Sequence, residues 1–230
     1  MLDLILNYRD MDNLWMYIVG FIVAIVVGMC CHEYAHARVA YNCGDDTAKL
    51  SGRMTLNPMA HLDPLGFLAL VVVGFGWAKP VPINPVRFKE YRKGMFLTSI
   101  AGILTNFTIC FFASGISMLF TYLGVACSAS SSSVVGLLMF LQILFLYIAI
   151  VNFSLAVFNL IPIYPLDGFN IMLSLTKGTN KFVEFLRKYG TIILLVLMLS
   201  TGLEFLMNFL VDNVFGQITS FWFRIIFGVY

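Results

Sequence analysis

Charged residues are scarce in this 230-residue chain. Lys, Arg, Asp and Glu together make up 11% of it, against roughly a quarter in an ordinary soluble domain. Hydrophobic residues make up 60% of the chain, and its mean hydropathy is +0.90. The formal net charge of +2 is too small to suggest a nucleic-acid partner. This composition excludes a soluble globule and favours a membrane domain.

The chain has few cysteines, and they do not form a recognisable framework. None of the five belongs to a CxxC pair, and Cys30, Cys31 and Cys110 fall in apolar runs, so we interpret them as small buried hydrophobes. Cys30 and Cys31 adjoin His32, but neighbouring residues on a helix point to different faces, so we do not expect them to be metal ligands. A cleavable signal peptide is not visible, because no small-residue cleavage site follows the first apolar run.

Long apolar runs predict an all-α polytopic membrane protein with about five to six transmembrane helices, since a complete span needs about 20 residues. The whole chain, 1–230, is expected to form one membrane-embedded domain, with its core in 14–175 and C-terminal helices in 189–230. The expected spans are residues 14–39, 95–125, 134–160 and 189–211. Residues 214–229 suit either a last span or an amphipathic interfacial helix.

The segments between these runs are polar. Residues 40–64, 79–94 and 176–188 are expected to be loops, because they are rich in charges and turn formers. Residues 65–78 are apolar but number only 14, which is too few for a span. We therefore predict a re-entrant or β-hairpin-like segment near 48–84.

The basic residues predict the orientation of the chain. Twelve of the fourteen Lys and Arg residues fall in three segments, 38–53, 79–93 and 177–188. Basic loops face the cytoplasm, and all three segments can do so if 65–78 is re-entrant. The uncharged, Ser-rich connector 126–133 then faces the opposite side. A multi-pass protein of a bacterial plasma membrane is expected, with archaeal and organellar membranes as alternatives.

The sequence His32-Glu33-Tyr34-Ala35-His36 closes the first apolar run. On a helix the two His residues lie one turn apart and project from the same face, so both imidazoles can reach one zinc ion. Glu33 beside them is suited to take a proton from a water molecule on the metal. Two imidazoles and a carboxylate are costly to bury in lipid, which favours a functional role.

A catalytic zinc site typically takes three protein ligands, and three candidates exist for the third: His61, Asp63 and Asp167. Asp167 is preferred, because it follows a stretch in which Pro162 and Pro165 break the helix. Irregular backbone at membrane depth is tolerated where it is buried in protein or lines a cavity. Asp63 is expected to make turn hydrogen bonds. His61 is a candidate for donating a hydrogen bond to a metal ligand or to a backbone carbonyl.

The same buried ligands suit a second class of protein, a membrane carrier for a metal or a proton. Transporters commonly show paired repeats of broken helices, whereas this sequence has one break of that kind, at 161–166. A third alternative is an inactive scaffold that binds membrane proteins, and the complete ligand set argues against it. Intramembrane Asn residues such as Asn106 and Asn159 are often contacts between helices.

Taken together, the motifs make the chain resemble the site-2 protease family of intramembrane zinc metalloproteases. The matching segments occur in the family's order and cover most of the chain through 168. They are HEYAH at 32–36, GRMTLNPMAHLDPLG at 52–66, GWAKPVPINP at 76–85, AGILTN at 101–106 and NLIPIYPLDG at 159–168. Ile103 stands where the family usually has Pro.

The resemblance implies Zn2+ as cofactor, with His32, His36 and Asp167 as ligands and Glu33 as catalytic base. It also implies that Asn159 contacts the substrate carbonyl and that Asn106 helps to hold the substrate. The implied activity is regulated intramembrane proteolysis, in which peptide bonds of transmembrane substrate proteins are hydrolysed near the cytoplasmic side of the lipid bilayer. The long segments at 52–66 and 76–85 resemble the compact branch without a PDZ or CBS domain.

Overall fold

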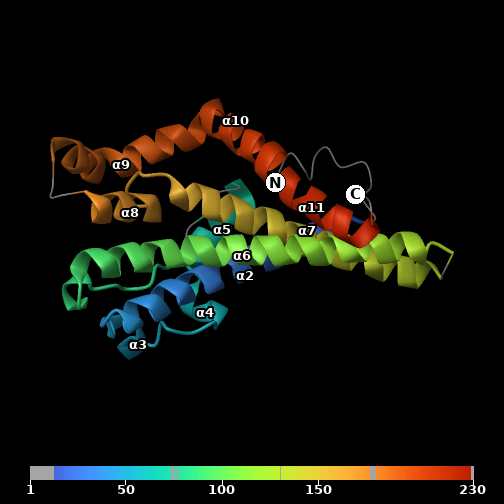
Figure 1. Cartoon of the computed structure of the whole chain (residues 1–230), viewed down its shortest axis with the longest axis horizontal. Coiled ribbons are helices and arrows are strands. Elements are labelled where there is room, and N and C mark those ends of the chain that lie inside the picture. The colour runs from blue at the N-terminus through green and yellow to red at the C-terminus, as the bar shows by residue number, and fades with distance from the viewer. Residues whose placement is uncertain (1–12, 74–75, 77, 130, 177–179, 229–230) are drawn as a thin grey trace.

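The structure is a computed structural model that describes residues 13–228, apart from 74–75, 77, 130 and 177–179. Three helices are long and apolar enough to cross a membrane: α2 (Leu14–Asn42), α6 (Tyr91–Ala126) and α7 (Ser132–Leu160). They pack side by side along the molecule (Figure 1). In the described ranges the regular elements are all helical, so the prediction of an all-α, multi-pass membrane protein is confirmed.

Small residues allow these three helices to approach one another closely. Ala24, Ala113 and Ala149 are almost completely buried and share one core cluster with Cys110 and Phe153. In lipid, helices associate through close packing rather than through the hydrophobic effect, which explains why small side chains occupy the contact. Cys110 is therefore a small core residue, as the sequence predicted. α6 runs without interruption through Ile103.

Among the described residues, fewer helices than the expected five to six are long and apolar enough to span a membrane. The described residues contain three such helices, or four if a bent pair counts as one. This pair joins α9 (Lys181–Leu199) to the segment 201–227, with a bend of 75°. The expected helix over 189–211 is not continuous, because the chain bends at Ser200. There the Ser200 hydroxyl donates to the Leu197 carbonyl, and such local bonds favour the end of a helix.

Residues 181–188, expected as a loop, form the first turns of α9. The Asn180 side chain caps this helix by accepting a hydrogen bond of 2.9 Å from the backbone N–H of Val183, as an N-cap residue does. Its basic residues lie exposed while Val183 and Leu186 are buried. An amphipathic helix therefore replaces the expected loop, because its charges all lie on one face.

The C-terminal arm turns back onto the bundle. It consists of α10 (Thr201–Leu210), the π-helical turn η3 (Val211–Phe215) and α11 (Gly216–Phe227). Trp222 of α11 donates a hydrogen bond of 2.9 Å to the carbonyl of Phe111 in α6, and the two rings pack with centroids 5.0 Å apart. Residues 214–227 thus form the returning limb of the bent pair; residue 229 lies outside the described residues.

Between α2 and α6 the chain makes short helices rather than strands. They are α3 (Thr47–Leu50), α4 (Pro58–His61), α5 (Pro64–Val73) and the 3-10 turn η2 (Pro85–Arg87). One antiparallel bridge joins Leu62 to Ala78, and the N–H of Lys79 donates to the His61 carbonyl. The chain therefore leaves and returns at one place, as a re-entrant path requires. The β-hairpin alternative is wrong for the described part, because the outgoing limb is helical; residues 74–75 and 77 of this segment are not among those described.

The basic segments gather at one end of the bundle. In Figure 1, α3, α8 (Asp167–Leu175) and the beginnings of α6 and α9 lie at the left, whereas the loop joining α6 to α7 lies at the far right. α7 ends at Leu160, just before Pro162, as predicted. This arrangement brings the end of α2 and the start of α8 to the same end of the molecule.

Candidate metal centre

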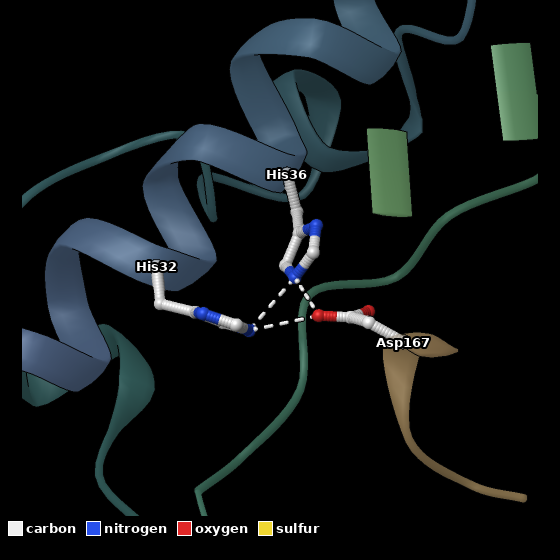
Figure 2. A group of neighbouring side chains, drawn as sticks. All are labelled: His32, His36 and Asp167. Atoms are coloured by element: carbon white, nitrogen blue, oxygen red, sulfur yellow. Dashed lines mark hydrogen bonds and ion pairs between the residues drawn. The ribbon is translucent and has the colours of Figure 1, made fainter. Parts of the chain in front are cut away.

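Three side chains from two distant parts of the sequence converge on one point. His32 and His36 project from one face of α2, and Asp167 reaches them from the start of α8 (Figure 2). The two Nε2 atoms are 2.9 Å apart, and Asp167 Oδ2 lies 3.2 Å from that of His32 and 3.1 Å from that of His36. Each of the three offers one metal-ligating atom, and all these atoms lie within 4.8 Å of one another.

The backbone of α6 fixes the orientation of His36. Its Nδ1 lies 2.7 Å from the carbonyl oxygen of Thr98. A carbonyl can only accept, so Nδ1 carries the proton and Nε2 is left with a free lone pair. A hydrogen bond of this kind behind a histidine fixes its tautomer and ring orientation for metal binding.

Gly102 makes room for both imidazoles against α6. A Cβ atom at this position would lie 2.6 Å from His32 Cε1 and from His36 Nε2, well inside the contact distance of non-bonded atoms. The position must therefore be glycine if α6 is to cover the histidine pair. The carbonyl of Thr98 lies one turn earlier on the same helix. The hydrogen bond to His36 and the close approach at Gly102 therefore both depend on where α6 lies relative to α2.

The start of α8 delivers the carboxylate. Gly168, next to Asp167, lies so close to the end of α7 that a Cβ there would be 2.3 Å from the Leu160 carbonyl oxygen. Burial disfavours a charged carboxylate, but the two imidazoles outweigh it and hold the pKa of Asp167 at about 2. α8 lies outside the three long helices. The carboxylate is therefore ionised near neutral pH, as a ligand must be.

The arrangement fits a bound cation. Asp167 Oδ2 is buried and, among the described residues, receives no well-aligned hydrogen bond although two ring nitrogens face it. Around a tetrahedral zinc with bonds of 2.0–2.1 Å, neighbouring ligand atoms lie about 3.3 Å apart. The observed separations of 2.9–3.2 Å are close to that value. Two imidazole nitrogens and a carboxylate oxygen are also ligands that zinc accepts.

Glu33 lies beside the cluster and is held by residues 79–84, the limb that leads from the re-entrant segment back toward α6. Its Oε2 accepts a hydrogen bond of 2.8 Å from the N–H of Val81. Arg53 in turn fixes this limb, because its Nη2 donates to the carbonyl of Lys79 at 2.5 Å and to that of Pro80 at 3.1 Å. An arginine from one loop thus sets where the amide that binds Glu33 lies.

A cavity of about 330 Å3 opens next to these groups. It is lined by His32, Glu33, His36 and Asp167, by the limb 80–85 and by Asn159. Asn159 lies in the last turn of α7 and donates its side-chain amide to the Leu155 carbonyl at 3.0 Å. A volume of this size lies at the lower end of the roughly 300–1,000 Å3 of small-molecule sites, so there is space for a ligand beside the cluster.

The remaining candidates lie elsewhere. Asn106 is fully buried in α6 and does not line this cavity. His61 is fully buried, and its Nε2 bonds to the backbone carbonyl of Thr55 at 2.7 Å rather than to a member of the cluster. Asp63 Oδ1 accepts from the N–H of Gly66 at 2.8 Å, which is the turn role expected of it.

Comparison with known proteins identifies the family of the chain. Peptidase family M50 matches residues 20–200, which include all three members of the cluster. The chain belongs to peptidase family M50. It is therefore a zinc metalloprotease, and its resemblance to the site-2 protease family is confirmed.

The relatives of this M50 peptidase carry names of the same kind. The chain is 41% identical to "Putative zinc metalloprotease YwhC" of Bacillus subtilis (strain 168) over 180 residues, which cover 78% of this chain and 80% of that protein. It is 26% identical over 196 residues to "Putative zinc metalloprotease Rip2" of Mycolicibacterium smegmatis, covering 81% of this chain and 70% of that protein. No solved structure matches the chain significantly.

Sequence reasoning did not single out several groups around the metal cluster. Thr98 contributes only a backbone carbonyl, and any residue there would supply one, so its side chain gives no signal. Gly102 lies in the AGILTN segment, but the contact that requires glycine comes from α2. Arg53 looks like one more basic loop residue. Only the folded structure shows that Arg53 reaches the limb beside Glu33.

Proposed function

We propose that this M50 peptidase cleaves peptide bonds of transmembrane proteins, with His32, His36 and Asp167 holding the zinc ion and Glu33 acting as base. The convergence of the two Nε2 atoms and Asp167 Oδ2 within 3.2 Å of one another carries the proposal. A zinc ion held by these residues would supply the Lewis acidity that activates a water molecule.

The protein groups then have separate roles. Glu33 takes the proton from the attacking water and returns it to the leaving nitrogen. The Thr98 carbonyl keeps the His36 lone pair directed at the cluster. Asn159, which lines the cavity, is positioned to donate its amide to the substrate carbonyl as negative charge develops there. Asn106 is buried in α6 and does not line the cavity. We therefore assign it an indirect role, in which it stabilises the packing of α6 rather than contacting the substrate.

The depth of the site supports a transmembrane substrate. His32 lies ten residues before the end of α2, a distance of about 15 Å at 1.5 Å per residue. His36 lies closer to the same end. The site is thus within an apolar helix but near the end where the basic segments gather. Since basic segments face the cytoplasm, we place cleavage near the cytoplasmic side of a bacterial plasma membrane.

The substrate must be locally extended to react, because a helical peptide bond is shielded by its own hydrogen bonds. Adding the substrate as a strand to an exposed backbone would replace these bonds. The limb 79–84 is non-helical and lies beside Glu33, whereas part of 49–57 is helical in α3. We therefore infer that 79–84 is the template. A cysteine scan of both segments tests the choice: changes in 79–84 should alter cleavage, and indifference there contradicts it.

The decisive experiment measures metal content and cleavage together. Glu33→Gln should keep stoichiometric zinc and lose cleavage of a model transmembrane substrate in reconstituted vesicles, whereas Asp167→Ala should lose both. Asp63→Ala is the control, since that carboxylate caps a turn. Zinc retained at wild-type affinity in Asp167→Ala would contradict the ligand set, and residual cleavage by Glu33→Gln would contradict the role of the base. A carrier would instead show altered zinc or proton flux in both variants.

A further inference from the structure

A second and larger cavity lies on the other side of the α2–α6 pair. Its volume is about 930 Å3, near the upper limit of the roughly 300–1,000 Å3 of ligand sites. None of the members of the metal cluster lines it. It is therefore separate from the metal cluster.

The helical repeat explains how one pair of helices lines two cavities. On α6, Thr98 and Gly102 face the histidines, whereas Leu97, Ala101 and Leu104 line the large cavity. On α2 the residues that line the large cavity are Cys31, Tyr34, Ala35, Arg38, Val39 and Asn42. Spacings of three and four residues define one face of a helix, so each helix presents one face to each cavity.

The walls and the rim of this groove differ in chemistry. Its walls are apolar and partly exposed: Leu97 is 38% and Leu104 54% accessible. Its rim carries the side chains of Arg38, Lys89 and Lys93, with Glu90 as the acidic neighbour of Lys93 at 3.4 Å. In the part of the chain that the structure describes, the side chains of Arg38 and Lys89 make neither a hydrogen bond nor an ion pair.

The dimensions of the groove match one leaflet of a bilayer. Lys93 and Leu104 are separated by eleven residues of α6, which is about 16 Å at 1.5 Å per residue. The hydrocarbon core of a bilayer is about 30 Å thick, or about 15 Å per leaflet. The rim also lies at the end of the bundle where the basic segments gather (Figure 1). A molecule with an anionic head and an apolar tail of leaflet length complements both parts.

We propose that this groove binds an anionic phospholipid. Its phosphate lies against Arg38, Lys89 and Lys93, and an acyl chain runs along Leu97, Ala101 and Leu104 toward the middle of the bilayer. Basic pockets between transmembrane helices bind anionic head groups in this way. The bound lipid contacts faces of α2 and α6 that adjoin those of His36 and Thr98, so it holds together the pair of helices that carries the metal site.

The test compares two triple variants with the same change of charge. Arg38→Gln/Lys89→Gln/Lys93→Gln removes the rim. Lys181→Gln/Arg187→Gln/Lys188→Gln removes one Arg and two Lys from the exposed face of α9, at the same end of the molecule. Each protein in detergent is titrated with phosphatidylglycerol, phosphatidylcholine or glycerol phosphate, and binding is read by native mass spectrometry and by the shift in melting temperature.

We expect phosphatidylglycerol to bind and stabilise the wild type and the α9 variant, with affinity in the rim variant on the order of tenfold to hundredfold weaker. Thr105 also lines the groove, so Thr105→Trp should fill its apolar part and weaken binding while leaving the basic rim intact. Equal affinities in the two triple variants, or equal binding of phosphatidylcholine, would overturn the proposal. Stabilisation by glycerol phosphate alone would show an anion site without a lipid. A neutral transmembrane peptide is added as a competitor. If it displaces lipid equally well from the wild type and from the rim variant, the groove receives a helix instead.

Discussion

His36 and Thr98 are joined by a hydrogen bond of 2.7 Å between the imidazole Nδ1 and a backbone carbonyl, across the contact between α2 and α6. Because this bond uses the Nδ1 proton, the Nε2 lone pair points toward His32 and Asp167. The position of α6 relative to α2 therefore decides whether the histidine pair can act as ligands. Predictions for the site follow from the residues that hold this and the neighbouring contacts.

Gly102→Ala is expected to disturb the metal site without removing any ligand. The added Cβ would lie 2.6 Å from atoms of both imidazoles, so α6 must move away or the rings must rotate. We expect zinc affinity to fall about tenfold to hundredfold, as for other changes behind metal ligands. Gly124→Ala on the same helix is the control, since nothing lies within 4 Å of its Cβ position. Equal zinc affinities in the two variants, measured by competition with a chelator, would contradict the assigned role.

Arg53→Gln is expected to lower activity while zinc content stays the same. The variant loses the donors that hold the Lys79 and Pro80 carbonyls, so the Val81 amide no longer stays in place beside Glu33. A hydrogen bond to a charged group is worth about 1.5–3 kcal/mol, which corresponds to a fall in kcat/KM of about tenfold to hundredfold. Arg87→Gln is the control, because this arginine pairs with Asp46 at the exposed surface. A parallel loss of zinc in Arg53→Gln would show a structural role instead.

Asn159→Ala and Asn106→Ala are expected to differ. Asn159 lines the cavity, and loss of a donor to the developing oxyanion costs about 100- to 1,000-fold in kcat. Asn106 is buried away from that cavity, so its substitution should act on stability and change kcat less than about tenfold. The measurement is kcat with saturating substrate at full zinc occupancy. A larger fall in kcat for Asn106→Ala would place the substrate against α6 instead.

Asp45→Ala is expected to destabilise the loop that carries Val81. This fully buried carboxylate accepts hydrogen bonds from the backbone N–H groups of Thr47 and Asn84, at 3.0 and 2.6 Å. The variant loses two hydrogen bonds to a charged acceptor, at a cost of about 2–4 kcal/mol. Asp46→Ala is a matched control from the next position, because its exposed pair with Arg87 contributes about 1 kcal/mol or less. Melting temperatures of the two variants in one detergent provide the comparison, and equal shifts would count against the buried role.

The spans show where sequence patterns are sufficient and where they are not. Runs of apolar residues predicted α2, α6 and α7 to within a few residues, because a helix in lipid must be apolar along its whole length. The break at Ser200 was missed, since the apolar run continues across it. Hydropathy does not record the local hydrogen bond that ends α9 there. The helical start of α9 was also missed, because the many charges of 181–188 are typical of a loop. Only the burial of Val183 and Leu186 shows that one face of a helix packs there.

The sequence by itself determined which groups are available to the site. The spacing of His32 and His36 places both on one face of a helix, and Pro162 and Pro165 end α7 before Asp167, because both effects act over a few neighbouring residues. Only the tertiary structure decided that α8 brings the Asp167 carboxylate within 3.2 Å of the imidazoles, that Thr98 and Gly102 of α6 fit behind them, and that Arg53 holds the limb beside Glu33. These are contacts between segments far apart in the chain, and they depend on how closely the helices pack, a quantity that no local pattern encodes.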